Sequence, residues 1–231
     1  MMNRKNFLRS TLLVTSSAAL LSLAATAQAE TPSFNFVQFD YIVSGDASAD
    51  LGGGTGTVDV NQGYGLQGAF EIGELAFVTG RSIDLNYDDK DGDIFGPSDS
   101  IVFTDMTFVG AGVHVPVADI AEIYGALGFA RPTVAFYAGE GFGVEVGARA
   151  NVGMAEVGLW YQTAKTSNKA SGEDLDIDPS ILGLDVAFNF SPDAPQLVLG
   201  YMDGKNTLKG DTGPDLDVDF KNFSIGVRKT F

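Results

Sequence analysis

Residues 142–152 read FGVEVGARANV, and their side chains alternate in character from one position to the next. The apolar and small residues Phe142, Val144, Val146, Ala148, Ala150 and Val152 share one parity. Gly143, Glu145, Gly147, Arg149 and Asn151 share the other. A period of two is that of a β-strand with two unlike faces. In a soluble sandwich the apolar face is the core, whereas in a transmembrane barrel it faces lipid and the polar face lines the interior.

The same alternation recurs along the chain and predicts ten strands. Their ranges are 34–44, 62–73, 75–87, 100–115, 121–137, 141–152, 154–166, 180–191, 196–204 and 217–231. The connections after them alternate between short turns and longer polar loops, apart from a short one near 138–140. Short turns at one end and longer loops at the other are typical of outer-membrane barrels. We therefore predict a closed antiparallel up-and-down transmembrane β-barrel of ten strands, or eight if 34–44 and 196–204 lie outside the wall.

The first 29 residues have the composition of a signal peptide. Arg4, Lys5 and Arg9 precede an apolar stretch, and Ala27-Gln28-Ala29 gives a small-residue cleavage site. The stretch is short for a membrane-spanning helix. We predict export and cleavage after Ala29, leaving residues 30–231 as a single barrel domain in the outer membrane of a Gram-negative bacterium.

Composition excludes several functional classes for the exported part. Loss of 29 residues removes three of the 14 basic side chains, so 11 basic and 30 acidic residues remain, a net charge of −19. Nucleic-acid binding requires a basic surface, which this chain lacks. The chain has no Cys, which rules out disulfides, thiolate metal sites and thiol nucleophiles.

The last strand carries an expected assembly signal. Phe223, Ile225, Val227 and Phe231 share one face, and the chain given ends on that terminal Phe. In this it resembles bacterial outer-membrane β-barrels, whose last strand ends in Phe after alternating apolar residues. The resemblance implies recognition by the barrel-assembly machinery. Lys229 departs from the pattern and is expected to extend to water at the periplasmic interface.

Two further stretches resemble the small OmpA-like and opacity-type barrels. They are VGAGVHVPV at 109–117 followed by AEIYGALG at 121–128, and GAR at 147–149 followed by AEVG at 155–158. This resemblance concerns the barrel architecture, and we expect no soluble C-terminal domain because the last predicted strand runs to residue 231. It does not decide function, because barrels of this group serve as anchors, adhesins, conduits or enzymes.

Charged residues on the expected inner face form the first candidate site. They are Asp105, Glu145, Arg149, Glu156, Asp185 and Arg228. Side chains fill a barrel this narrow, and buried charges must pair. We expect Arg149 to pair with Glu145 and Glu156. The alternative is a selectivity ring in a small cation pore.

The single histidine offers little for catalysis. His114 lies just before a short turn, at the end away from outer-leaflet lipid, and no Ser is near it in sequence. A lipid hydrolase of this fold would need a Ser, a His and a carboxylate together. We predict no enzymatic activity and no cofactor.

The acidic loops are candidates for weak divalent-cation binding. Asp89, Asp91 and Asp93 match the opening of an EF-hand loop, but Ile94 and Ser100 replace its Gly and bidentate Glu. No dedicated metal site is expected. Clustered carboxylates are instead expected to bind Ca²⁺ or Mg²⁺ loosely, next to lipopolysaccharide phosphates.

These patterns favour a non-enzymatic barrel with a structural or surface-interaction role. A narrow, porin-like, cation-preferring channel is the alternative, and a lipid-modifying enzyme is the third possibility. The expected partners are outer-membrane lipids, lipopolysaccharide and the assembly machinery, with the barrel as a monomer.

Overall fold

A computed structural model describes residues 31–50, 55–89, 100–134, 137–168, 175–191, 194–210 and 215–231. The expected signal peptide, residues 1–29, lies outside this part of the chain. The described strands are β1 (Phe36–Asp50), β2 (Thr55–Glu71), β3 (Ala76–Asp89), β4 (Ser100–Ala118), β5 (Ala121–Val134), β6 (Tyr137–Ala138), β7 (Glu140–Val152), β8 (Ala155–Asn168), β9 (Leu175–Phe188), β10 (Gln196–Gly210) and β11 (Leu216–Thr230).

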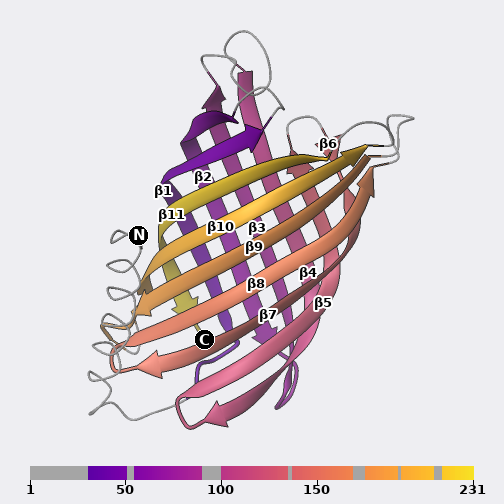
Figure 1. Ribbon diagram of the computed structural model, residues 1–231. Coiled ribbons are helices and arrows are strands. Elements are labelled where there is room, and N and C mark those ends of the chain that lie inside the picture. The colour runs from indigo at the N-terminus through magenta and orange to yellow at the C-terminus, as the bar shows by residue number, and fades with distance from the viewer. Residues whose placement is uncertain are drawn as a thin grey trace, which may run out of the picture.

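The strands close into one antiparallel barrel (Figure 1). Each long strand pairs with its neighbours in the chain, and β4 pairs with β5. The first strand pairs with the last from Phe36–Thr230 to Ala49–Val218 and so closes the sheet. The two-residue β6 only extends the edge of β5. The wall therefore has ten strands as predicted, and the eight-strand alternative is wrong. Within the described ranges, no helix is long and apolar enough to span a membrane.

Short turns gather at one end of the barrel, the lower end in Figure 1. Two of them are the hairpins 72–75 and 153–154, which contain Gly73 at φ 88° and Gly153 at φ 65°. These left-handed conformations suit glycine because it has no Cβ. The first residue of β1 and the last of β11 pair at this same end. It is the periplasmic end of the predicted topology.

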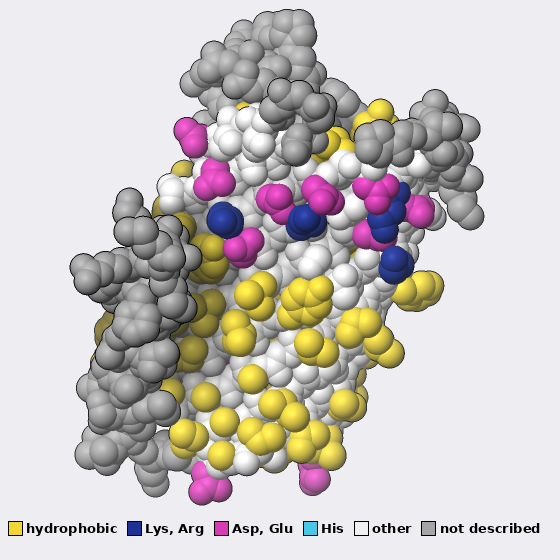
Figure 2. Space-filling model, in the orientation of Figure 1, with side chains coloured by type: hydrophobic (Ala, Val, Ile, Leu, Met, Phe, Trp, Pro, Cys, Tyr) yellow, Lys and Arg dark blue, Asp and Glu magenta, His cyan; other side chains and the backbone are white. Residues whose placement is uncertain are grey.

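The outside of the wall carries an apolar band. Large side chains stay exposed along its strands, such as Leu127 at 70% and Phe142 at 80%. Figure 2 shows this band on the β8–β11 side, with acidic and basic side chains gathered above it. An apolar surface this continuous requires the hydrocarbon of a bilayer rather than water.

The interior changes in composition along the barrel axis. Its periplasmic half holds buried charged and polar side chains, among them Gln38, Arg149, Glu156 and Arg228. Above them, on the strand ends away from the short turns, lies an apolar core. Its members include Ile83, Leu85, Met106, Phe108, Val134, Ile177, Ile181, Val218 and Phe220.

The strands are longer than the sequence patterns predicted. The expected loops 45–61 and 205–216 are largely strand, because β1 reaches Asp50, β2 begins at Thr55 and β10 reaches Gly210. Segments 34–44 and 196–204 contribute to β1 and β10 of the wall. In the predicted strand 75–87, Phe77, Arg81 and Ile83 all point inward, so apolar and charged side chains share its lumen face.

Candidate functional site

The main candidate site is a charged network in the periplasmic half of the lumen, with Glu156 at its centre. Oε1 of Glu156 accepts hydrogen bonds from Nε and Nη2 of Arg149 at 2.9 and 2.7 Å. The same oxygen accepts one from Nη1 of Arg228 at 2.6 Å. Nε of Arg228 also donates to Oε1 of Gln38 at 2.6 Å. These four side chains are buried, so their hydrogen bonds tie β1, β7, β8 and β11 together across the lumen.

A second group extends this network towards the periplasmic rim. Oε2 of Glu122 lies 3.1 Å from Nδ1 of His114, and its Oε1 lies 3.7 Å from Nη1 of Arg149. Both side chains are buried, and Nε2 of His114 has no hydrogen-bond partner within the part of the chain that the structure describes. His114 therefore bonds to a carboxylate on one side and presents its other nitrogen to the lumen.

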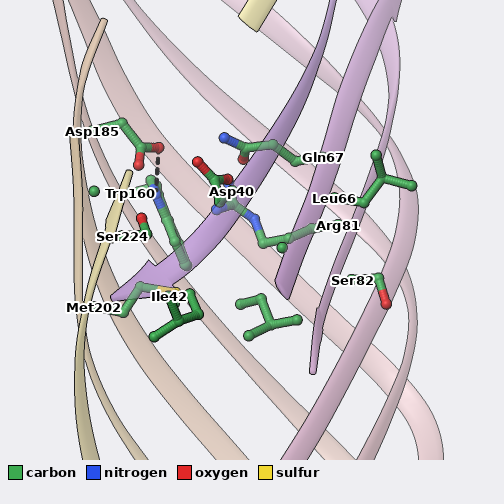
Figure 3. A pocket seen from close by; sticks show the side chains of 13 residues that line it. Asp40, Ile42, Leu66, Gln67, Arg81, Ser82, Trp160, Asp185, Met202 and Ser224 are labelled. Carbon is green, nitrogen blue, oxygen red and sulfur yellow. Dashed lines mark hydrogen bonds between the residues drawn. The ribbon is translucent and has the colours of Figure 1, made fainter. Parts of the chain in front are cut away.

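A third group lies higher, where Arg81 stacks on Trp160. The guanidinium carbon of Arg81 is 3.5 Å from the indole centroid, a cation–π contact. Its Nε lies 3.4 Å from Oε2 of Glu145, and Nε1 of Trp160 donates to Oδ2 of Asp185 at 3.2 Å. Figure 3 shows Asp40, Arg81, Trp160 and Asp185 turned toward one another, with the Trp160–Asp185 hydrogen bond dashed.

Two small cavities lie beside these groups. A cavity of about 20 Å³ lies beside Asp40, Arg81 and Trp160, and one of about 30 Å³ lies beside Glu145 and Arg149. Each has room for one or two water molecules. Within the described residues, no cluster of three or more His, Cys, Asp or Glu side chains is arranged to hold a metal ion.

A separate group of charges lies on the outer surface above the apolar band. Nζ of Lys165 and Nζ of Lys209 lie 3.2 and 2.7 Å from Oδ2 of Asp178. Nζ of Lys205 lies 2.9 Å from Oδ2 of Asp217. Hydrogen bonds from Lys205 and from Thr207 hold the pKa of Asp217 below its usual value. These charges face water or lipid headgroups rather than the lumen.

The structure places most of the expected lumen charges inside the barrel. Glu145, Arg149, Glu156 and Arg228 are buried there, and Asp185 lies beside Trp160. Glu145, however, lies next to Arg81, while Arg149 contacts Glu156 and Glu122. The sequence analysis did not identify three buried residues of this interior: Gln38, Asp40 and Glu122. Glu122 could have been found, because neighbouring residues of a strand point to opposite faces and Ile123 next to it points outward.

The prediction that Asp105 points into the lumen is wrong, because Asp105 lies on the outer face of β4. Its neighbours Thr104 and Met106 are buried inward, and Asp105 is paired across the sheet with Asp84 and Thr133. This part of β4 lies above the apolar band. Asp105 is only partly exposed there, and its Oδ1 is buried without a hydrogen-bond partner among the described residues, so the outward orientation still carries a desolvation cost.

The structure describes the side chains of the expected assembly signal but not those of the expected divalent-cation site. Phe223, Ile225, Val227 and Phe231 point outward, with exposed fractions of 54%, 46%, 51% and 70%, so they face lipid. Their role in assembly stays a prediction. The side chains of Asp89, Asp91 and Asp93 lie outside the described part, and the divalent-cation prediction remains untested.

Comparison with known proteins identifies the fold. The outer-membrane protease OmpT from Escherichia coli superposes with a TM-score of 0.52, covering 86% of this chain and 98% of that one at 7% identity. The fold is that of an outer-membrane β-barrel. Neisserial surface protein A matches with a TM-score of 0.37 at 15% identity, over 86% of this chain and 98% of that one. Ail of Yersinia pestis matches with a TM-score of 0.35 at 14% identity, over 85% and 100%.

No protein-family model matches the chain, and no curated protein matches it significantly. Closed strand pairing, the apolar outer band and this fold together place the chain in the outer membrane. At these sequence identities the similarity shows a shared architecture alone. It does not show that this chain has the protease activity of OmpT.

Proposed function

We propose that this outer-membrane barrel does not conduct and has a structural or surface-interaction role. The observation that carries the proposal is the filled lumen. The Glu156 network crosses the periplasmic half, and the apolar core fills the described part of the other half. The two cavities beside the charged groups, of about 20 and 30 Å³, are each too small to hold a hydrated ion.

Planar-bilayer recording of the refolded protein tests this proposal. We expect no steady conductance from protein that migrates faster unheated than boiled on a denaturing gel, the mobility shift that marks a folded barrel. Steady ohmic steps with cation preference would contradict the proposal. They would support the second candidate, a narrow cation channel.

The charge balance of the lumen is what favours the channel as second candidate. Three arginines, at 81, 149 and 228, lie among five carboxylates at 40, 122, 145, 156 and 185. An excess of acid would attract cations if water filled this half of the barrel. The apolar core above it argues against a continuous aqueous path.

We also propose that the barrel is not an enzyme. The ring of His114 lies against Phe34 and Phe77, with centroids 4.6 and 6.1 Å apart. Among the described residues, no Ser or Thr hydroxyl hydrogen-bonds to its Nε2, which is buried. A His–carboxylate pair without an adjacent nucleophile is incomplete for hydrolysis.

We propose as partners the outer-membrane lipids, lipopolysaccharide and the assembly machinery, and we expect a monomer that belongs with the OmpA-like group. The apolar band supports the lipid contact. The charges at 165, 178 and 209 lie where lipopolysaccharide headgroups, and divalent cations between them, would meet the wall. The motifs at 109–117 and 147–149 support the grouping.

Phe231→Ala tests the assembly signal. We expect several-fold less folded barrel in outer membranes, because the assembly machinery would no longer find the terminal aromatic side chain that it is expected to recognise. Phe142→Ala, which removes an outward aromatic side chain from β7 and leaves the last strand unchanged, is the control and should have a smaller effect. Comparing heat-modifiable bands from cells with refolding in detergent separates assembly from stability. Equal yields for both variants in cells would count against the signal.

A further inference from the structure

Residues 31–35 precede the barrel wall and turn into its periplasmic mouth. Strand pairing begins only at Phe36, yet Phe34 is 2% exposed and Pro32 is buried. The Phe34 ring stacks on Phe77 with centroids 4.3 Å apart and lies edge-on to Tyr124 at 5.3 Å. A segment outside the wall thus places an aromatic ring inside the lumen.

Four strands build the site that receives this ring. Phe77 comes from β3, His114 from β4, Tyr124 from β5 and Arg149 from β7. The guanidinium carbon of Arg149 lies 4.8 Å from the centre of the Phe34 ring. Stacked, edge-on and cation–π contacts each favour a flat aromatic group over an aliphatic one. The chemistry of the site therefore selects an aromatic side chain.

Apart from the Phe34 ring, residues 31–35 are held by hydrogen bonds at the rim. Oε1 of Glu71 accepts a hydrogen bond from the backbone N of Phe34 at 3.0 Å, and its Oε2 accepts one from Nδ2 of Asn35 at 3.0 Å. The backbone N of Phe231 donates to the carbonyl of Asn35 at 3.0 Å. Opening of the segment breaks these few hydrogen bonds and exposes the buried Phe34 ring, but it leaves the ladder of the wall, which begins at Phe36, in place. Such local openings occur in proteins without global unfolding.

We propose that residues 31–35 form a releasable strap, and that the site beneath Phe34 binds the aromatic side chain of an extended peptide. In this structure the chain's own strap is the occupant. Release uncovers Nε2 of His114 and one face of the Arg149 guanidinium, while the Glu156 network stays in place. This goes beyond a structural role, because it gives the periplasmic end a peptide-docking site.

The sequence supplies two independent reporters for this movement. It has one His and one Trp. His114 lies against the strap ring, whereas Trp160 lies higher in the lumen beside Arg81 and Asp185. Modification of His114 by diethyl pyrocarbonate therefore reports opening of the mouth. Trp160 fluorescence reports unfolding of the barrel.

The first test uses Glu71→Gln, with Glu74→Gln in the same turn as the matched control. Glutamine has one carbonyl oxygen and cannot accept both hydrogen bonds that Glu71 accepts. We expect about tenfold faster modification of His114 in Glu71→Gln, with Trp160 fluorescence and gel mobility unchanged. Glu74→Gln should react like the original protein. Equal rates in both variants, or faster modification accompanied by exposure of Trp160, would overturn the strap.

The second test adds a peptide to Phe34→Ala, which empties the aromatic site. The probe is the blocked peptide Thr-Pro-Ser-Phe-Asn, the sequence of residues 31–35, compared with Thr-Pro-Ser-Ala-Asn. We expect the Phe peptide to slow His114 modification at least fivefold and the Ala peptide to have no effect. Equal protection by the two peptides, or protection by neither, would overturn the aromatic site. If Phe34→Ala fails to fold, the same peptides are applied to Glu71→Gln.

Discussion

Glu156→Gln is expected to lower the free energy of unfolding by about 3–5 kcal/mol, the usual cost of removing one partner from a buried ion pair. The glutamine keeps the volume of the side chain and one carbonyl acceptor. It removes the negative charge that Arg149 and Arg228 share at 2.7 and 2.6 Å. Arg149 would then have Glu122 at 3.7 Å as its nearest remaining carboxylate in the network. Urea unfolding of the refolded variant in lipid vesicles measures the loss.

The matched control is Glu140→Gln, the same chemical change in an exposed pair. Glu140 lies 3.8 Å from Arg131, and their side chains are 62% and 57% exposed. Water screens such a pair, so the expected loss is about 1 kcal/mol or less. Similar small losses in both variants would mean that water fills the lumen around Glu156. That result would contradict the plugged barrel and favour the channel.

The fold was predictable because a strand pattern is local. The alternation in residues 142–152 is visible in eleven consecutive letters, and it continues in β7 of the structure. The Arg149–Glu156 contact was predictable for a similar reason, since the hairpin at 153–154 joins the two strands. The contact of Arg228 with Gln38 joins residues 190 positions apart. It depends on closure and on the stagger of the strands, which no local pattern specifies.

The errors have a common physical cause, a reversal of polarity along the strands. Within the bilayer the outer face is apolar, and the rule that polar side chains point inward holds. Above the band the outer face meets water, while the lumen is lined by residues such as Ile177 and Phe220. Applying the bilayer rule there turned Asp105 inward. It also made polar strand ends, such as residues 205–210, look like loops.

Because the lumen above the charged network is apolar and packed, a substitution there should also lower the free energy of unfolding strongly. Phe108 is 0% exposed and points inward from β4, in a cluster with Met106 and Ala130. Phe108→Ala is expected to lower the free energy of unfolding by about 3–5 kcal/mol, because it removes a buried ring and leaves a cavity. Unfolding in urea, followed by tryptophan fluorescence and by gel mobility, measures the change.

Phe108→Leu is the control, because it keeps an apolar side chain of roughly similar size at the same position. It is expected to cost less than about half as much, since only part of the packing is lost. If this half of the lumen held water instead, Phe108 would already be hydrated and the alanine variant would lose little. Losses of about 1 kcal/mol or less in the free energy of unfolding for both variants would therefore show that this half of the lumen is not a dry apolar core. The non-conducting proposal would then lose its main support. A large loss for alanine and a small one for leucine requires a dry, packed core above the charged network.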